Sequence, residues 1–138
     1  MIVYTNSLEG INEENLDSVF FHEWPNPPSI KHLYMILKNS SYIYVAIHTE
    51  TKKVVGFINA LSDQVLTAYI PLLEVTPAFK NQGIGTQLVE RMLEQLKDYY
   101  MIDLLCDADL QDYYSQKGMI KAAGMMKRNY NNQSGKNI

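Results

Sequence analysis

The residues best suited to chemistry lie in segment 80–86, which reads Lys-Asn-Gln-Gly-Ile-Gly-Thr. The segment separates a strand-like run from a strongly helical one. Free main-chain N–H groups at a helix start attract an anion, and glycines such as Gly83 and Gly85 let a phosphate approach the backbone. Lys80 adds a positive charge and Gln82 a hydrogen-bond donor. The pattern predicts a phosphate site, although a plain turn before a helix can carry the same two glycines.

Two common phosphate-binding motifs are absent from the sequence. A dinucleotide fingerprint would place a glycine at position 88, where Leu88 stands. A P-loop would end in Gly-Lys followed by Ser or Thr, and no such triplet occurs. The predicted ligand is therefore neither a nicotinamide dinucleotide nor a nucleoside triphosphate.

Two motifs resemble a known enzyme family. Leu-Leu-Glu-Val-Thr-Pro at residues 72–77, followed by Lys-x-x-Gly-x-Gly at 80–85, resembles motif A of the GNAT superfamily of acyl-CoA-dependent N-acyltransferases. Tyr-Tyr-Ser-Gln-Lys-Gly-Met at 113–119 is similar to a second motif of that family, Phe-Tyr-x-x-x-Gly-Phe. Both motifs occur in the family's order, and the resemblance covers roughly residues 42 to 130.

The resemblance implies acetyl-CoA as cosubstrate and assigns binding roles along the chain. Main-chain groups of Leu73 and Val75 would pair with the pantetheine arm, and one amide there would polarise the thioester carbonyl. Asp107 stands where many members have an asparagine that binds the cofactor. The pyrophosphate would be held by Lys80 and by the amides of Gln82, Gly83, Ile84, Gly85 and Thr86.

Acetyl transfer to an amine needs a base for the amine and an acid for the departing thiolate. The resemblance makes Tyr114 the general-acid candidate, and the alternative is a core aromatic residue. Glu74 is the base candidate, because a carboxylate beside the predicted strand gap could take the proton directly or through water. A solvated charge or a substrate-binding anion is the alternative for Glu74, and His22 and His48 are further base candidates.

The sequence gives little support for a metal site or for covalent catalysis by a cysteine. His22, His32 and His48 show no metal-ligand spacing with acidic residues or Cys106, so no metal is predicted. Cys106 has no partner base in any motif and is expected to be a small buried residue. The Trp24–Ser29 segment is expected either to line the acceptor pocket or to be a connecting loop.

The order of the expected helices and strands, together with the resemblance, predicts a mixed α/β, GNAT-like fold that positions these residues. It has a central, largely antiparallel sheet of six to seven strands, splayed between the fourth and fifth strands and flanked by about four helices. Pro71 predicts a local distortion, because proline removes a ladder donor. Strands are expected at 1–4, 42–48, 54–61, 65–75 and 101–106 with a final hairpin of 119–122 and 125–130, and helices at 11–21, 30–37, from the glycine loop to Leu96, and at 110–116.

Length and composition predict one domain over 1–130 and a polar, frayed tail over 131–138. Hydrophobic residues make up 46% of the 138 residues and charged residues 20%, which is typical of globular proteins. The net charge of −3 predicts no binding of nucleic acid or of an anionic membrane. The single cysteine excludes an internal disulfide, and the lack of Lys or Arg before Lys31 argues against a signal peptide and for the cytoplasm.

The function implied by the resemblance is transfer of an acetyl group from acetyl-CoA to a primary amine, by direct attack in a ternary complex. The acceptor is expected to be a small-molecule amine or a protein amine. Because members of the family commonly form homodimers, the resemblance also implies a homodimer. The alternative is a non-catalytic acyl-CoA-binding regulatory module on the same fold.

Overall fold

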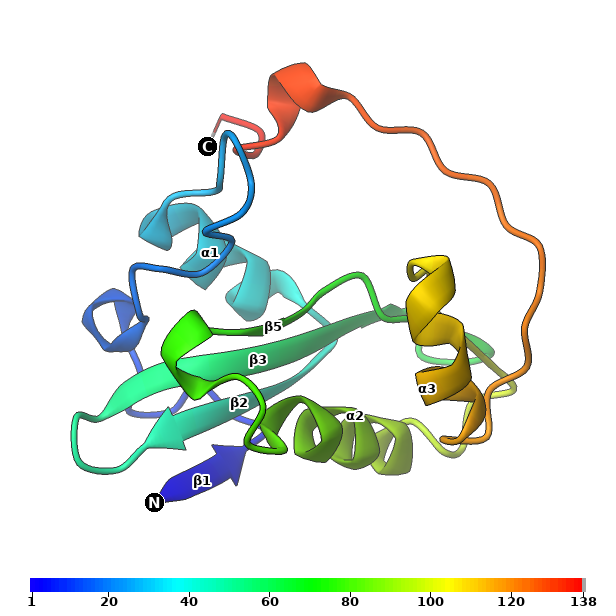
Figure 1. The fold of residues 1–138 in the computed structure, drawn as a ribbon, viewed down its shortest axis with the longest axis horizontal. Coiled ribbons are helices and arrows are strands. Elements are labelled where there is room, and N and C mark those ends of the chain that lie inside the picture. Colours follow the sequence, from blue (N-terminus) through cyan, green and yellow to red (C-terminus); the bar gives the residue numbers. More distant parts are fainter. Residues whose placement is uncertain (138) are drawn as a thin grey trace.

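The centre of the molecule is a six-stranded sheet, seen in a computed structural model that describes residues 1–137 (Figure 1). The strand order is β1-β2-β3-β4-β6, and β5 also pairs with β3. All pairs are antiparallel except β4 with β6, which is parallel. The strands are β1 (Ile2–Thr5), β2 (Tyr42–His48), β3 (Lys53–Ser62), β4 (Thr67–Tyr69), β5 (Leu73–Val75) and β6 (Met101–Asp103).

Three α-helices and four short 3-10 helices complete the described residues. The α-helices are α1 (Ile30–Asn39), α2 (Ile84–Gln95) and α3 (Gln111–Ser115), and the 3-10 helices span Glu13–Asn15, Pro77–Phe79, Ala108–Leu110 and Tyr130–Asn132. The mixed α/β, GNAT-like fold class predicted from the sequence is confirmed, with three α-helices in place of about four. No helix within residues 1–137 is long and apolar enough to cross a membrane.

The sheet is covered on both faces, because β3 is apolar on both sides. Val55 and Ile58 pack with α2 on one face, whereas Val54 and Phe57 pack with α1 and the N-terminal loops on the other. The two helices therefore lie on opposite sides of the sheet (Figure 1). Gly56 of β3 allows α2 to pack closely against the sheet, because a Cβ at position 56 would lie only 3.1 Å from the Ile84 Cγ2 atom.

The fourth predicted strand is interrupted at Pro71, as expected from the missing ladder donor. Residues 70–72 separate β4 from β5, and both short strands pair with the long β3. The buried Asn59 side chain fills the break, because its Oδ1 accepts from the Leu72 N–H (3.1 Å) and its Nδ2 donates to Ser40 Oγ (3.0 Å). Within residues 1–137, the next strand, β6, pairs with β4 alone, which leaves β5 with one open edge.

The predicted helix over Ile11–Phe21 is wrong. Only Glu13–Asn15 forms a single 3-10 turn, and the chain then runs beside β3, where the Asp17 N–H donates to the Val54 carbonyl (3.3 Å). Asp17 also bonds the Val19 N–H through its side chain, and such local bonds compete with helix formation.

The predicted C-terminal hairpin is also wrong. Residues 119–129 contain no strand or helix, and the chain runs outside the molecule before it reaches the 3-10 helix at Tyr130–Asn132. The tail that follows contacts α1 instead of fraying, since the Lys136 carbonyl lies 3.0 Å from His32 Nε2. Ile138 lies outside the described residues.

Candidate functional site

A cavity of about 450 Å³ lies between β5, the start of α2 and α3. Both sequence motifs contribute to its wall, although 27 or more residues separate them in the sequence. The lining residues are Leu73, Glu74, Val75, Phe79, Lys80, Asn81, Gly83, Ile84, Gly85, Thr86, Leu110, Tyr113 and Tyr114.

The glycine loop presents a row of main-chain donors at the start of α2. Within residues 1–137 the N–H groups from Asn81 to Thr86 have no hydrogen-bond acceptor, and Gly83 at the N-cap supplies no side chain to satisfy them. Asn81 and Gly83 both have positive φ, 63° and 84°, so successive amides turn toward one concave surface. Unsatisfied amides, the helix dipole and the Lys80 ammonium together suit a multiply charged anion such as a diphosphate.

The open edge of β5 offers a second set of main-chain groups. Thr76 N–H donates to Val55 (2.8 Å) and Asn59 N–H donates to the Leu72 carbonyl (3.2 Å), so the even-numbered residues of this strand bond to β3. Because main-chain groups alternate along a strand, those of Leu73 and Val75 point away from β3 and toward the open edge. An extended amide-containing chain can pair there as an additional strand.

Glu74 is half-buried beside this edge, and its side chain lies on the opposite face from Leu73 and Val75. Its Oε1 accepts from the Phe21 N–H (3.3 Å). Burial raises the pKa of the Glu74 carboxyl above its ordinary value of 4.5, while the Phe21 N–H and the Lys80 and His22 charges oppose the rise. A carboxylate with a raised pKa is a better proton acceptor than a solvated one.

Phe21 holds this carboxylate in place at a conformational cost. It is buried with φ of 60°, a backbone region that bulky residues rarely adopt. The Phe57 ring (6.0 Å between centroids) and the Trp24 ring (4.5 Å) pack against it. Strained residues of this kind gather at functional sites, where the surrounding packing enforces them.

Tyr114 and Tyr113 form the α3 wall of the cavity. Burial, with smaller contributions from Tyr113 and Cys106, raises the pKa of Tyr114 to about 12, so its hydroxyl remains a proton donor at neutral pH. Tyr113 instead fixes the position of α3, because its hydroxyl donates to Thr86 Oγ1 (3.1 Å). An ion pair between Lys117, just after α3, and Glu90 of α2 (2.9 Å) adds a second link to α2.

The cavity brings together most of the site residues predicted from the sequence, but not all. Gln82 does not line it, and its side chain reaches toward the Ala78 carbonyl (3.5 Å). Asp107 precedes the 3-10 helix at Ala108–Leu110 and also lies outside the lining. His48 bonds Thr51 (3.0 Å) and is not a lining residue, whereas His22 is close enough to influence the Glu74 carboxyl.

Other residues of the site were not predicted from the sequence. Phe79, Asn81, Leu110 and Tyr113 line the cavity, and the adjacency of three of them to predicted site residues is the signal that could have found them. Phe21 had no such signal, because it lies 53 positions from Glu74 in the sequence.

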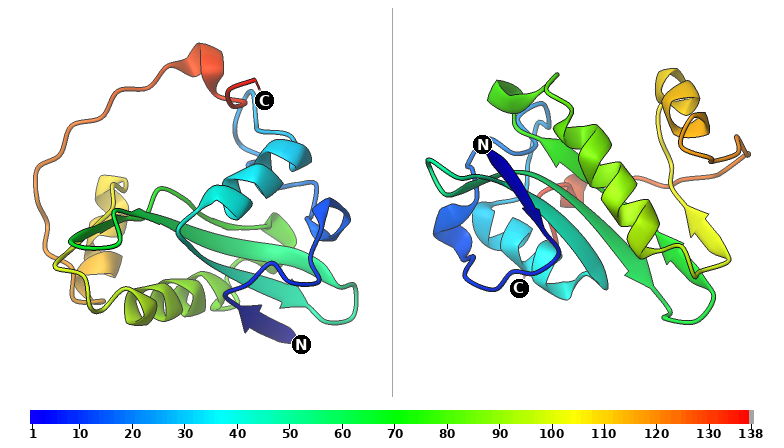
Figure 2. Two further views of the ribbon diagram at one scale, coloured as in Figure 1. Left: turned by 180° about the vertical axis from the view of Figure 1, so that it is seen from behind. Right: turned by 90° about the horizontal axis from the view of Figure 1, so that it is seen from below.

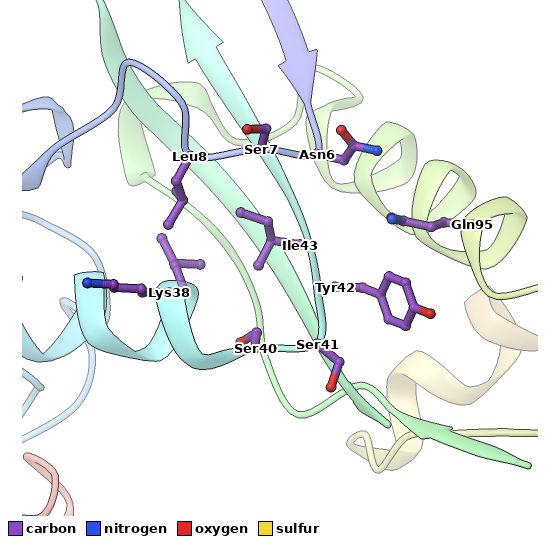
Figure 3. Close-up of a pocket in the computed structure, with 10 residues that line it drawn as sticks. Asn6, Ser7, Leu8, Lys38, Ser40, Ser41, Tyr42, Ile43 and Gln95 are labelled. Atoms are coloured by element: carbon purple, nitrogen blue, oxygen red, sulfur yellow. The ribbon is translucent and has the colours of Figure 1, made fainter. Parts of the chain in front are cut away.

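A second hollow, of about 310 Å³, lies between the start of β2, the end of α1 and Gln95 of α2 (Figure 3). Hydroxyl, amide and aliphatic side chains make up most of its wall, with no acid–base pair comparable to Glu74 and Tyr114. Among residues 1–137, no three His, Cys, Asp or Glu side chains are grouped as metal ligands.

Comparisons with known proteins agree on the family. The profile of the acetyltransferase (GNAT) family matches residues 10–119. The chain is 32% identical over 127 residues to the uncharacterized N-acetyltransferase ycf52 of Pyropia yezoensis, and the match covers 86% of this chain and 71% of that one. It is also 32% identical over 107 residues to the histone acetyltransferase TAP1 of Glycine max, where the match covers 69% of this chain and spans about half of the relative (46%).

Solved structures give the same result. A crystal structure of a Deinococcus radiodurans R1 protein assigned as an acetyltransferase superimposes with a TM-score of 0.92 at 40% identity, covering 99% of this chain and 94% of that one. The motif at the start of α2, the open edge of β5 and the family profile thus lead to one assignment. The chain belongs to the GNAT family of N-acetyltransferases.

Proposed function

We propose that this chain transfers the acetyl group of acetyl-CoA to a primary amine by direct attack in a ternary complex. The observation that carries the proposal is the shared cavity, because Glu74 and Tyr114 line the same cavity as the unsatisfied amides at the start of α2. Family membership alone would leave the chemistry open, since one fold hosts many functions.

The cavity residues fit acetyl-CoA in three places. The amides of Gly83 to Thr86 and the Lys80 ammonium suit the diphosphate, and Gly83 adds no side chain that would obstruct it. The outward main-chain groups of Leu73 and Val75 suit the amide-containing pantetheine arm, as an added strand. One of these N–H groups would lie beside the thioester carbonyl, where a fixed donor stabilises the developing oxyanion.

Glu74 and Tyr114 supply the two proton transfers. Glu74 accepts a proton from the attacking ammonium, directly or through a water molecule, and the freed amine nitrogen forms its bond to the acetyl carbonyl carbon. The carbon–sulfur bond then breaks, and the Tyr114 hydroxyl donates its proton to the departing thiolate. The acetylated nitrogen then loses its second proton, through water, to the Tyr114 oxygen, which restores the hydroxyl, and Glu74 releases its proton to solvent. The products are an N-acetylated amine, CoA and one proton.

The acceptor is proposed to be a small-molecule amine or a protein amine that carries positive charge. Glu23 lies beside His22 near the Glu74 carboxylate, and the chain's net charge is −3. The Glycine max relative is named a histone acetyltransferase, which adds lysine side chains to the acceptors worth testing.

The proposal is tested by acetyl-CoA turnover against a panel of polyamines, aminoglycosides, arylalkylamines and lysine peptides, with CoA binding measured by calorimetry in parallel. Formation of CoA together with an acetylated amine is the expected result. Tight CoA binding without turnover on any amine would instead favour the non-catalytic acyl-CoA-binding module. A folded chain that does not bind CoA would exclude both functions.

A further inference from the structure

The hollow of about 310 Å³ between the start of β2, the end of α1 and Gln95, which we call the edge hollow, lies at an edge of the sheet (Figure 3). The chain leaves β1 close to the point where α1 ends, as both views of Figure 2 show. β1 therefore pairs with β2 only from Val45, opposite Thr5, to His48. Within the described part of the chain, residues 42–44 have no strand beside them on that edge.

The main-chain groups of Ile43 face this uncovered edge. Its partner on β3 is Asn59, whose N–H donates to the Leu72 carbonyl (3.2 Å) on the far side of β3. The main-chain groups of Ile43 and Asn59 therefore point away from each other, as in every second pair of an antiparallel ladder. The Thr49 N–H, which donates to the Met1 carbonyl (3.0 Å), shows the same alternation farther along this edge. Within residues 1–137, neither the N–H nor the C=O of Ile43 has a hydrogen-bond partner.

Gln95, the last residue of α2, brings a second unpaired amide to the edge hollow. Its Oε1 atom is buried and has no hydrogen-bond partner among the described residues. Figure 3 shows its side chain directed from α2 toward β2, with the amide nitrogen foremost. A half-turn about the last side-chain bond exchanges the two amide atoms, so Gln95 can present either a donor or an acceptor to the hollow. A buried polar atom without a partner destabilises the fold unless a ligand or water satisfies it.

Two serine hydroxyls among the lining residues add hydrogen-bond donors. Ser7 Oγ accepts from the Glu9 N–H (3.0 Å), and Ser41 Oγ accepts from the Ser62 N–H (2.9 Å). Neither hydroxyl has an acceptor for its own hydrogen in the part of the chain that the structure describes. Each is therefore held in place by the backbone and keeps its hydrogen available for a ligand.

Charge is scarce around the edge hollow. Lys38 is the one charged residue among its described lining residues, and Figure 3 shows the Lys38 ammonium directed away from Ile43 and Gln95. α1 ends at Asn39 and α2 at Gln95, so the negative ends of two helix dipoles lie beside the hollow and disfavour an anion. A cation would find no carboxylate among the described lining residues. The hollow therefore suits an uncharged ligand.

The α1 side of the edge hollow is apolar, and the free stretch of β2 is short. Leu8, Leu37 and Ile43 line the hollow and pack in the same core cluster, on the α1 face of the sheet. Within the described strand β2, Ile43 is the one outward-pointing residue that β1 leaves uncovered, because pairing with β1 begins at Val45. This length accommodates a single amino-acid unit and not a longer strand.

We propose that the edge hollow binds a small, uncharged N-acylated amino acid amide with an aliphatic side chain. Such a molecule has an N–H and a C=O on either side of one carbon, and these exchange two hydrogen bonds with Ile43 as a neighbouring strand residue would. Cross-strand partners share a face of the sheet, so the ligand's side chain packs against Leu8 and Leu37. Gln95, on the α2 side, bonds a flanking amide of the ligand. This site lies at the opposite end of α2 from the glycine loop and does not depend on the proposed acetyl transfer.

Titration of the isotope-labelled full chain with N-acetyl-L-leucine N′-methylamide, followed by NMR, tests the proposal. We expect saturable shifts of the Ile43 main-chain amide and of the Gln95 side-chain amide. Methylation of the probe's leucine nitrogen removes the donor to Ile43 and should weaken binding about tenfold. N-acetyl-L-leucine, whose carboxylate faces two helix C-termini, should also bind about tenfold more weakly. Equal affinity for the methylated probe, shifts confined to the cavity between β5 and α3, or no shifts up to the probe's solubility limit would each overturn the proposal.

A pair of glutamine variants on one helix tests the place of the site. Gln95→Met keeps the length of the side chain and should weaken binding of the probe about fivefold, because the polar partner is lost. It should unfold at a temperature no lower than the parent, since it removes a buried acceptor without a partner. Gln87→Met is the matched control, because Gln87 is exposed on α2 and lines neither cavity.

Calorimetric titration with CoA separates this site from the proposed active site. Saturation with the probe should leave CoA affinity unchanged, whether or not the chain proves to be an acetyltransferase. Displacement of CoA by the probe would place the probe in the cavity between β5 and α3 and overturn the proposal. Unchanged affinity of Gln95→Met for the probe, together with a lower unfolding temperature, would show that Gln95 serves only the fold and would also overturn it.

Discussion

At the scale of single residues, burial disfavours the charged form of Glu74, and its side chain lines the candidate cavity. Its raised pKa means that the folded chain binds the carboxyl proton more tightly than the unfolded chain does. That contribution to stability is present below the unfolded pKa of about 4.5 and is lost as the pH rises through the folded pKa. At neutral pH the ionised carboxylate is therefore a source of instability.

Glu74→Gln should lower kcat by about 10²- to 10⁴-fold, because the base is lost while the acceptor for the Phe21 N–H remains. The same variant should unfold at a higher temperature than the parent at pH 7, and this difference should shrink as the pH falls toward 4.5. Turnover and thermal unfolding over that pH range are the measurements. Glu23→Gln removes an exposed carboxylate nearby and should change neither kcat nor the unfolding temperature. Full activity of Glu74→Gln would exclude Glu74 as the base.

Tyr114→Phe should reduce kcat by about 10²-fold with little change in CoA affinity, since only the proton donor is removed. Because the pKa of Tyr114 is about 12, its ionisation should cause no loss of parent activity between pH 7 and 10. Tyr113→Phe is the matched control, because it loses the bond to Thr86 and keeps the ring. Equal losses of kcat in the two variants would indicate that Tyr114 serves only to pack α3.

At the scale of elements, the turn into α2 must combine positive φ with open space above its amides. Gly83 and Gly10 provide a comparison, because both have positive φ, 84° and 76°, and at neither position would a Cβ have another atom within 4 Å. A side chain at either position costs about 1–2 kcal/mol of backbone strain. Of the two, Gly83 alone lies in the row of unsatisfied amides.

Gly83→Glu should abolish measurable CoA binding, since it places a carboxylate where the diphosphate is proposed to lie. Gly10→Glu adds the same charge with a similar strain, and it should bind CoA as the parent chain does. Calorimetric titration with CoA distinguishes the two, and thermal unfolding should show comparable destabilisation in both. Unchanged affinity in Gly83→Glu would remove the glycine loop from the proposed site.

Elements with a strong local signal could be predicted from the sequence, and those fixed by distant contacts could not. The apolar stripe from Leu88 to Leu96 predicts helix α2, and the β-branched and aromatic run of β2 predicts a strand. Pro71 predicts the break between β4 and β5. The role of Asn59 in filling that break depends on Leu72 across the sheet, so no local pattern reveals it.

The two wrong elements have the same physical origin. The apolar spacing over Ile11–Phe21 resembles a helix, yet its backbone bonds to β3 and its apolar side chains enter the core without helical periodicity. The composition of residues 119–130 predicts strands, but no strand forms there and no partner strand lies beside the segment within residues 1–137. In the first segment, tertiary contacts override the helical propensity. In the second, the strand propensity has no partner strand to pair with, so no strand forms.

At the scale of the whole molecule, the sheet is expected to separate the two proposed substrates, acetyl-CoA and the amine. Leu73 and Val75 pack with the α2 side, where the glycine loop lies, whereas Phe21 and Trp24 pack with the α1 side. Glu74 lies between them, because it lines the cavity and bonds to Phe21. The amine is therefore expected to approach from the α1 side, past the half-buried Trp24, and acetyl-CoA from the α2 side.

Trp24→Ala should raise the KM for the amine at least tenfold and leave the KM for acetyl-CoA within about twofold, because it opens only the α1 side. Lys80→Ala should show the reverse pattern, since the Lys80 ammonium lies beside the glycine loop. Initial rates with each substrate varied in turn separate the two constants, and Trp24→Phe should recover most of the amine affinity by restoring a ring against Phe21. If Trp24→Ala raised both constants equally, the ring would act through the Phe21–Glu74 contact rather than on the amine, and the sheet would not divide the two binding sites.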